Sequence, residues 1–66
     1  MRIMLNGEER EFAGIKTVEE LVSHLELDNS RIATELNFNV VRKSDYAATE
    51  LEEGDKLEIV TFVGGG

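Results

Sequence analysis

The sequence contains no cysteine, and this absence excludes two kinds of site. No disulfide can stabilise the fold, and no cysteine-based metal or redox centre can form. The absence is consistent with a reducing, cytoplasmic setting. Proline is also missing, which is unremarkable in a chain of 66 residues.

Long apolar runs are missing as well. The first residues, Met1 to Leu5, reach the polar pair Asn6-Gly7 too soon to form the apolar core of a signal peptide. The other apolar runs are far shorter than the roughly 20 residues that a membrane-spanning helix needs. We therefore expect a cytoplasmic protein without a membrane segment.

Basic residues are scarce. Seven lysines and arginines face 14 aspartates and glutamates, which gives a formal net charge of −7. Nucleic acid would repel such a surface, so a role in binding a phosphate backbone is disfavoured. The charge either serves solubility or steers the protein toward a basic groove on a protein partner, and composition does not separate these two roles.

A chain of 66 residues holds a single domain. A domain of this size buries only about 60% of the surface of its unfolded chain. It has no room for a deep catalytic cleft behind a full core. The length therefore favours a carrier, an adaptor or a binding module over an enzyme.

The beginning of the chain predicts a β-hairpin. Side chains alternate over residues 2–5 as in a half-buried strand. Asn6-Gly7 follows, and both residue types tolerate a positive φ, which predicts a two-residue hairpin turn. Residues 8–12 predict a second strand at the edge of a sheet, with Phe12 as its core anchor.

A helix is predicted after the hairpin. Thr17 can accept a hydrogen bond from a backbone N–H of the first turn, and Glu20 lies three residues later, the pattern of a capping box. Asp28-Asn29-Ser30 is expected to end the helix. Between them, apolar residues recur with the spacing of one helical face. These residues are Val18, Leu21, Val22 and Leu25.

The second half of the chain predicts mainly strands and turns. The strongest strand covers residues 56–63, with Leu57 and Ile59 on one face and Val60 and Phe62 on the other. The elements before it are a strand over 31–37, a turn over 37–39, a stub of strand at 40–41, a helical turn within 44–49 around Tyr46, and a turn over 53–55.

This order predicts an α+β fold of the β-grasp (ubiquitin-like) type. One helix stripe must be covered by one face of a sheet, here a mixed sheet of four to five strands. A hairpin followed by a helix crossover places the first and last strands side by side. We expect a β-grasp domain over residues 1–63 and a flexible glycine tail over residues 64–66.

Side-chain chemistry is not indicated. The single histidine, His24, has no evident metal partner, so we interpret it as a surface residue of the helix. No Ser-His-Asp cluster has plausible spacing, and no glycine-rich loop joins a strand to a helix. We therefore predict no catalytic side chain, no metal ligand and no bound cofactor.

The remaining reactive group is the α-carboxylate of Gly66. Extended, the three terminal glycines reach roughly 10 Å beyond Val63, and the lack of side chains lets the backbone enter a narrow channel. ATP can adenylate a carboxylate, and a sulfur nucleophile can then convert it to a thiocarboxylate. The alternative is a flexible linker or a cloning remnant.

The chain resembles the ThiS family of sulfur carriers from one end to the other. It departs from the family pattern at Phe38, where many relatives have glycine, and at Arg42, where proline is frequent; both lie in a surface turn. The segments that carry the resemblance are Asn6, Thr17 to Leu21, Glu35 to Asn37, Val41 before a basic pair, Tyr46-Ala47, Leu51 to Asp55, Leu57 to Val60 and Val63 to Gly66.

The resemblance implies a role in making the thiazole of thiamin. An E1-like adenylating enzyme, ThiF, would activate Gly66 with ATP, and a persulfide donor would supply sulfur. Thiazole synthase, ThiG, would accept the sulfur from the thiocarboxylate. Gly65 would be the obligatory slim neighbour of Gly66, and the carrier itself would catalyse nothing.

A docking surface is expected beside the tail. Val60 and Phe62 are predicted on the open face of the sheet, with Met4 beside them on the adjacent strand. An exposed apolar patch next to a reactive tail is typical of a docking site, although single exposed apolar residues are also ordinary. We include Val63 and Gly64 in this predicted partner-binding set.

Three other functions remain open at this point. The first is a sulfur carrier for molybdopterin, of the MoaD type, which usually has a longer chain. The second is a ubiquitin-like modifier that forms isopeptide bonds with lysines after the same adenylation. The third is a plain β-grasp binding module whose glycines are only a linker.

Overall fold

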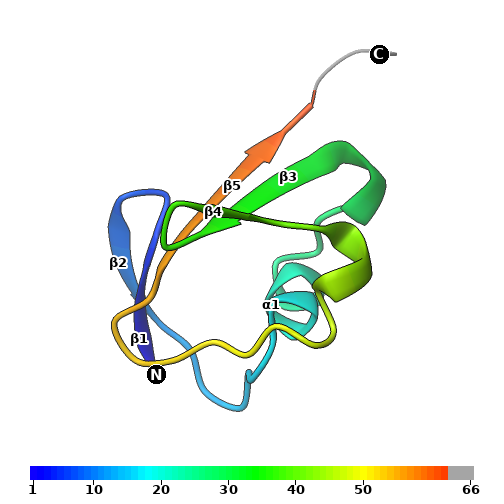
Figure 1. The fold of residues 1–66 in the computed structure, drawn as a ribbon. Helices are drawn as coiled ribbons and strands as arrows, with labels where there is room; N and C mark the ends of the chain where they lie inside the picture. The colour runs from blue at the N-terminus through cyan, green and yellow to red at the C-terminus, as the bar shows by residue number, and fades with distance from the viewer. Residues whose placement is uncertain (63–66) are drawn as a thin grey trace.

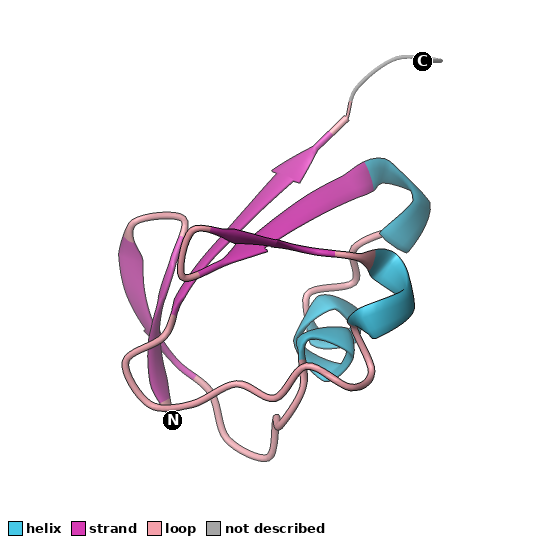
Figure 2. Ribbon diagram, viewed as in Figure 1, coloured by secondary structure: helices cyan, strands magenta, loops and turns pink. Residues whose placement is uncertain are grey.

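The computed structural model describes residues 1–62, which form a five-stranded mixed sheet packed on one helix (Figures 1 and 2). The strand order is β2-β1-β5-β3-β4, so β5 lies in the centre. Strands β1 and β5 are parallel neighbours, which confirms the predicted β-grasp arrangement. The elements are β1 (Arg2–Leu5), β2 (Glu8–Glu11), α1 (Val18–His24), η1 (Asn29–Arg31), β3 (Ile32–Leu36), β4 (Asn39–Val41), η2 (Lys43–Asp45) and β5 (Lys56–Thr61).

The helix begins where it was predicted and ends earlier. Thr17 Oγ1 accepts a hydrogen bond from Glu20 N–H at 3.1 Å, which is the first half of the capping box. The Glu20 carboxylate accepts from Lys16 N–H at 2.7 Å and not from Thr17. The last helical residue is His24, because the chain turns into a left-handed conformation at Glu26, with φ 57°.

The predicted helix stop at Asp28 has a different role. The Asp28 carboxylate accepts hydrogen bonds from the Ser30 hydroxyl at 2.7 Å and from Ser30 N–H at 2.9 Å. It therefore caps the short helix η1, and the two bonds lower the pKa of this exposed carboxyl. The polar triplet Asp28-Asn29-Ser30 does lie at a helix boundary. That boundary is the start of η1 and not the predicted end of α1.

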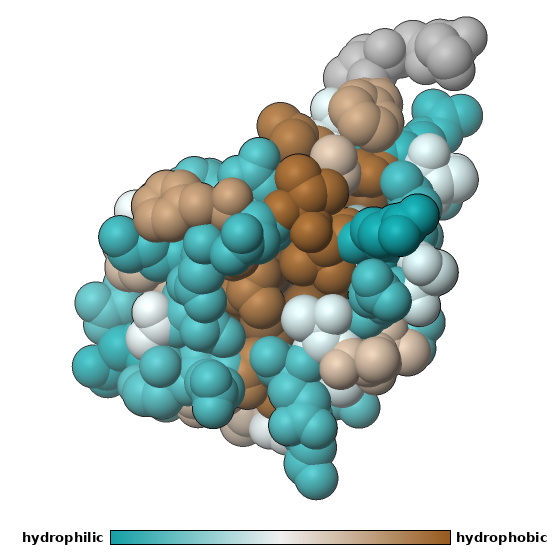
Figure 3. Space-filling model, viewed as in Figure 1, coloured by the Kyte–Doolittle hydropathy of each residue, from teal (hydrophilic) through white to brown (hydrophobic). Residues whose placement is uncertain are grey.

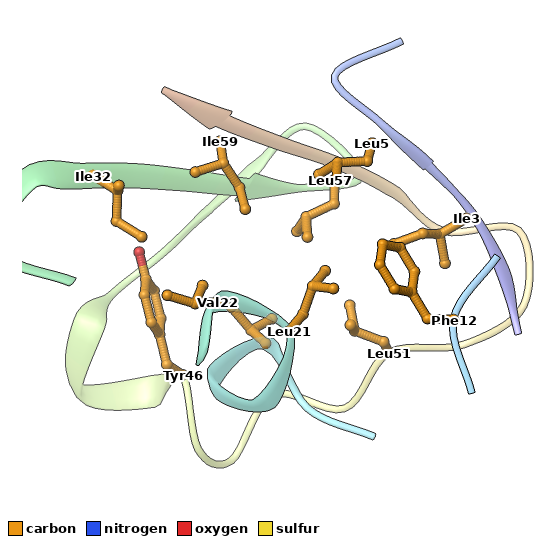
Figure 4. Packing of buried hydrophobic residues seen from close by; sticks show 11 residues of the cluster. Ile3, Leu5, Phe12, Leu21, Val22, Ile32, Tyr46, Leu51, Leu57 and Ile59 are labelled. Atoms are coloured by element: carbon orange, nitrogen blue, oxygen red, sulfur yellow. The ribbon is translucent and has the colours of Figure 1, made fainter. Parts of the chain in front are cut away.

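The core lies between the helix and one face of the sheet (Figure 4). Phe12 is buried just beyond β2, as predicted, and Leu25 is only partly buried. Tyr46, which directly follows η2, donates a hydrogen bond to Thr34 Oγ1 at 2.7 Å inside this core. The other buried apolar residues are Ile3, Leu5, Val18, Leu21, Val22, Ile32, Leu51, Leu57 and Ile59.

Two hairpin turns have the same left-handed backbone. Asn6 and Gly7 join β1 to β2 with φ values of 50° and 82°. Asn37 and Phe38 join β3 to β4 with φ values of 50° and 71°. Two consecutive positive φ values match the twist of a two-residue hairpin. In the second turn, however, a bulky residue occupies a conformation that glycine adopts without strain.

The stub of strand predicted at residues 40–41 is part of a short edge strand of three residues, β4, which pairs with β3. Strand β5 ends at Thr61, and the last two residues predicted for it are Phe62, which follows it directly, and Val63. The predicted domain boundary at residue 63 and the glycine tail lie outside the described residues. Within residues 1–62, no helix is long and apolar enough to cross a membrane.

We predict that Phe38→Gly raises the free energy of unfolding by about 0.5–1 kcal/mol, because glycine removes the left-handed strain. The gain is reduced by the loss of a cation–π contact, in which Lys56 Nζ lies 5.4 Å from the Phe38 ring. Urea denaturation measures the change. Gly7→Ala in the first hairpin is the converse control and should lower stability, since its Cβ meets no neighbouring atom within 4 Å and only strain opposes it. A less stable Phe38→Gly variant would contradict the strain at this turn.

Candidate functional site

The predicted reacting end of the chain lies outside the described residues. This applies to Gly65 and Gly66 and to two members of the partner-binding set, Val63 and Gly64. The structure does describe the strand that leads to them. The described part of the candidate site consists of β5 and the surface around its end.

Strand β5 is held on both sides. It pairs in parallel with β1 through Leu57 and in antiparallel with β3 from Leu57 to Thr61. Beyond the strand, Phe62 N–H donates to Arg31 O at 2.7 Å. A central strand with neighbours on both edges is the least free to move, so β5 gives its end a fixed starting point.

Val60 and Phe62 are exposed on the open face of the sheet, as predicted. Their exposed fractions are 61% and 56%, whereas Leu57 and Ile59 on the other face are buried. Val60 lies opposite Ala33 of β3, which extends the apolar area onto the next strand. Figure 3 shows apolar surface reaching the point where β5 ends.

Met4 is on the same face but not beside Val60 and Phe62, so that part of the prediction is wrong. It is half-buried and pairs with Lys56, four residues before Val60 in β5. At about 3.3 Å per residue, the two side chains are separated by roughly 13 Å along the strand. The reason is the register of the two strands. Strand β1 pairs only with the first two residues of β5 and ends at Leu5, before β5 reaches Val60. Met4 instead lines a shallow pocket with Phe38.

Sequence reasoning missed two features of this face. Val40 in β4 is 73% exposed and lies opposite Glu35 of β3. Glu35 also lies directly opposite Glu58 of β5, so two like charges face each other across the central strands. Within residues 1–62, neither glutamate has a salt-bridge partner. The alternation of β5 already placed Glu58 on this face, but its neighbour depends on the β3–β5 register.

Other candidate side chains do not assemble into a site. His24 is exposed, and its ring packs edge-on against Phe12 at a centroid distance of 5.8 Å. No group of three His, Cys, Asp or Glu residues within the described part of the chain could hold a metal ion. An open groove between α1 and the loop around Gly14 is lined largely by polar side chains and is formed by other elements than β5.

The chain combines a β-grasp scaffold with a central strand that leads in sequence to three terminal glycines. The ThiS family model matches residues 3–66. The chain belongs to the ThiS family. This confirms the resemblance that the sequence segments indicated.

Individual relatives agree with the family match. The sulfur carrier protein ThiS of Bacillus subtilis is 34% identical over 65 residues, which cover 97% of this chain and 98% of that protein. The crystal structure of the thiamine biosynthesis protein ThiS from Geobacter metallireducens superimposes with a TM-score of 0.84 at 32% identity, and each chain is covered completely.

A second kind of relative is much longer. A protein named thiazole synthase from Paramagnetospirillum magneticum is 48% identical over 66 residues, and another from Magnetococcus marinus is 39% identical over the same length. The match covers all of this chain but only 20% of each of those proteins. This chain therefore spans about a fifth of the length of these relatives.

We predict that Glu58→Gln raises the free energy of unfolding by up to about 0.5 kcal/mol at low ionic strength, because it relieves the repulsion with Glu35. Urea denaturation in low and high salt checks this, since salt should shrink the gain. Glu19→Gln makes the same change in net charge at the start of α1, where the helix dipole favours the negative charge. It should lower stability. Equal effects in the two variants would mean that overall charge, and not the opposed pair, is responsible.

Proposed function

We propose that this chain is a sulfur carrier of thiamin biosynthesis that works through the carboxylate of Gly66. Membership of the ThiS family over residues 3–66 supports this, together with the end-to-end similarity to a protein named sulfur carrier protein ThiS. The single observation that carries the proposal is that the matched region includes the terminal glycines. The proposal assigns no catalytic role to any side chain of the carrier.

Activation of the carboxylate is assigned to an E1-like adenylating enzyme of the ThiF type. A Gly66 carboxylate oxygen attacks the α-phosphorus of ATP, and pyrophosphate leaves. The acyl-adenylate is then open to attack at the carbonyl carbon by the terminal sulfur of a persulfide, and AMP leaves. A thiol reduces the resulting acyl disulfide and releases the thiocarboxylate. ATP is thus a substrate of the partner and not a cofactor bound by this chain.

Thiazole synthase, ThiG, is the proposed sulfur acceptor. Two relatives named thiazole synthase contain a segment that matches this chain along its whole length. Joining a carrier to the enzyme that uses it raises their effective concentration, so such a fusion supports a functional pairing. Because activation needs ATP, we place the carrier in the cytoplasm.

The family match favours this function over its rivals. A molybdopterin carrier of the MoaD type or a lysine-linked modifier would share the fold and the adenylation step. A binding module with a glycine linker would not need the last residues. These alternatives differ in the product formed at Gly66.

We expect ATP, the cognate adenylating enzyme and a persulfide donor to convert the protein to a C-terminal thiocarboxylate. Intact mass spectrometry would show one oxygen exchanged for sulfur, and the protein without Gly65 and Gly66 should remain unchanged. An unchanged mass of the full chain would overturn the proposal. Lysine-linked adducts in place of the thiocarboxylate would establish the modifier function.

The exposed apolar residues at the end of β5 are the proposed docking surface for these partners. Phe62 directly precedes Val63 and Gly64, and Val60 lies two residues before Phe62, so we expect a partner that receives the tail to cover both side chains. Burying a phenylalanine side chain supplies on the order of 1.5–3 kcal/mol. The repulsion between Glu35 and Glu58 on the same face would be relieved by a basic side chain of the partner.

Phe62→Asp should therefore weaken binding to the adenylating enzyme or to thiazole synthase by roughly tenfold or more, because it removes about 1.5 kcal/mol of apolar burial. Isothermal titration calorimetry with each partner measures the affinity. Phe38→Asp is the matched control, since Phe38 is 78% exposed but lies in the β3–β4 turn. Unchanged affinity of the Phe62 variant would remove this residue from the interface.

A further inference from the structure

The ladder between β1 and β5 ends before β5 does. The last paired residues are Leu5 and Leu57, and Asn6 N–H adds one bond to Leu57 O at 2.9 Å. The chain then turns away into the first hairpin. Backbone groups alternate in direction along a strand, so the next residue of β5 that faces β1 is Ile59. The turn leaves it without a backbone partner on that side.

The side chain of Asn6 takes that place. Its Oδ1 accepts a hydrogen bond from Ile59 N–H at 2.7 Å, and its Nδ2 donates to Ile59 O at 3.2 Å. The amide thus acts as one more rung of the ladder beyond the end of β1. Few side chains can do this. Aspartate lacks the donor, and glutamine is one methylene longer.

Asn37 provides a matched arrangement at the other end of β5. Its φ is also 50°, and its backbone N–H donates to Lys56 O at 2.8 Å. Its Oδ1 accepts from Lys56 N–H at 3.0 Å, and its Nδ2 donates to Asp55 Oδ1 at 3.0 Å. The two asparagines therefore hold opposite edges of the same strand. Asn37 holds the first residue of β5, and Asn6 holds its fourth.

Within residues 1–62, the contact at Ile59 is the last one on the β1 side of β5. Beyond it, Thr61 pairs with Ile32, and Phe62 N–H bonds to Arg31 O, both on the β3 side. Without the Asn6 side chain, β5 would be held along one edge only beyond Leu57. That stretch includes Val60 and Phe62 and leads directly to the terminal glycines.

We propose that Asn6 is a positioning residue for the reaction at Gly66, an inference that rests on the proposed carrier function. By holding the backbone N–H and C=O of Ile59, it fixes the direction of the last part of β5, from which the terminal residues extend toward the adenylating enzyme. The Gly66 carboxylate then reaches the α-phosphate of ATP in the productive geometry more often than it would from a strand whose end is free to move. Misplacement by about 1 Å can lower the rate of such a step by up to a hundredfold.

The test compares Asn6→Gly with Asn37→Gly. Glycine adopts a φ near 50° without strain, so each hairpin turn is kept while the side-chain bonds to β5 are lost. Steady-state pyrophosphate release with the cognate adenylating enzyme, ATP, a persulfide donor and a reducing thiol is measured below the unfolding transition of all the proteins. Both variants should lose similar thermal stability. Asn6→Gly should lower kcat by the order of ten- to a hundredfold at nearly constant KM, and Asn37→Gly should keep a kcat close to that of the wild type.

Amide hydrogen exchange gives a readout independent of the enzyme. Exchange at Ile59 should accelerate in Asn6→Gly but not in Asn37→Gly, and exchange at Lys56 should show the reverse. Asn6→Asp keeps the acceptor and loses the donor, so it should have an intermediate kcat; it also serves as the test if Asn6→Gly does not fold. Equal kcat values for the Asn6 and Asn37 variants would overturn the inference alone. A wild-type protein that releases no pyrophosphate would overturn the proposed function and this inference with it.

Discussion

The pairing of β5 on both of its edges is the constraint on which the structure depends. This strand joins the β1–β2 hairpin to the β3–β4 hairpin, which share no ladder with each other in the described part of the chain. Its buried residues Leu57 and Ile59 point from the sheet into the core (Figure 4). Its backbone also leads to the terminal residues. Stability and function therefore converge on one segment of six residues.

The two faces of the sheet have opposite requirements. The covered face packs apolar side chains against α1, and its buried Thr34 is satisfied by the Tyr46 hydroxyl. The open face carries exposed Val60, whose side chain adds nothing to stability in the isolated chain, and a pair of opposed glutamates, whose repulsion costs stability. A small domain has little stability to spare. Their presence on the face next to the terminus is reasonable if a partner covers that face.

Features of the fold that depend on the spacing of neighbouring residues could be predicted from the sequence. Alternation located β1, the Asn6-Gly7 pair located the first hairpin, and helical spacing located α1. Contacts that depend on the register between paired strands could not be predicted. Met4 was expected beside Val60, but only the β1–β5 pairing shows that it lies opposite Lys56. Likewise, Asn6 predicted a turn, whereas its bonds to Ile59 join residues 53 positions apart and have no local signal.

Both hairpin turns show how one residue type can serve two levels of structure. Asparagine tolerates a positive φ, so it satisfies the turn, and its amide then continues the ladder that the turn interrupts. Glycine would satisfy the first requirement alone. The asparagine at position 6 is therefore explained by long-range geometry, whereas the neighbouring Gly7 is explained by local backbone strain. A sulfur carrier has to present its terminus in a reproducible way, and on the proposal above the side chains that matter for this are the ones that fix β5.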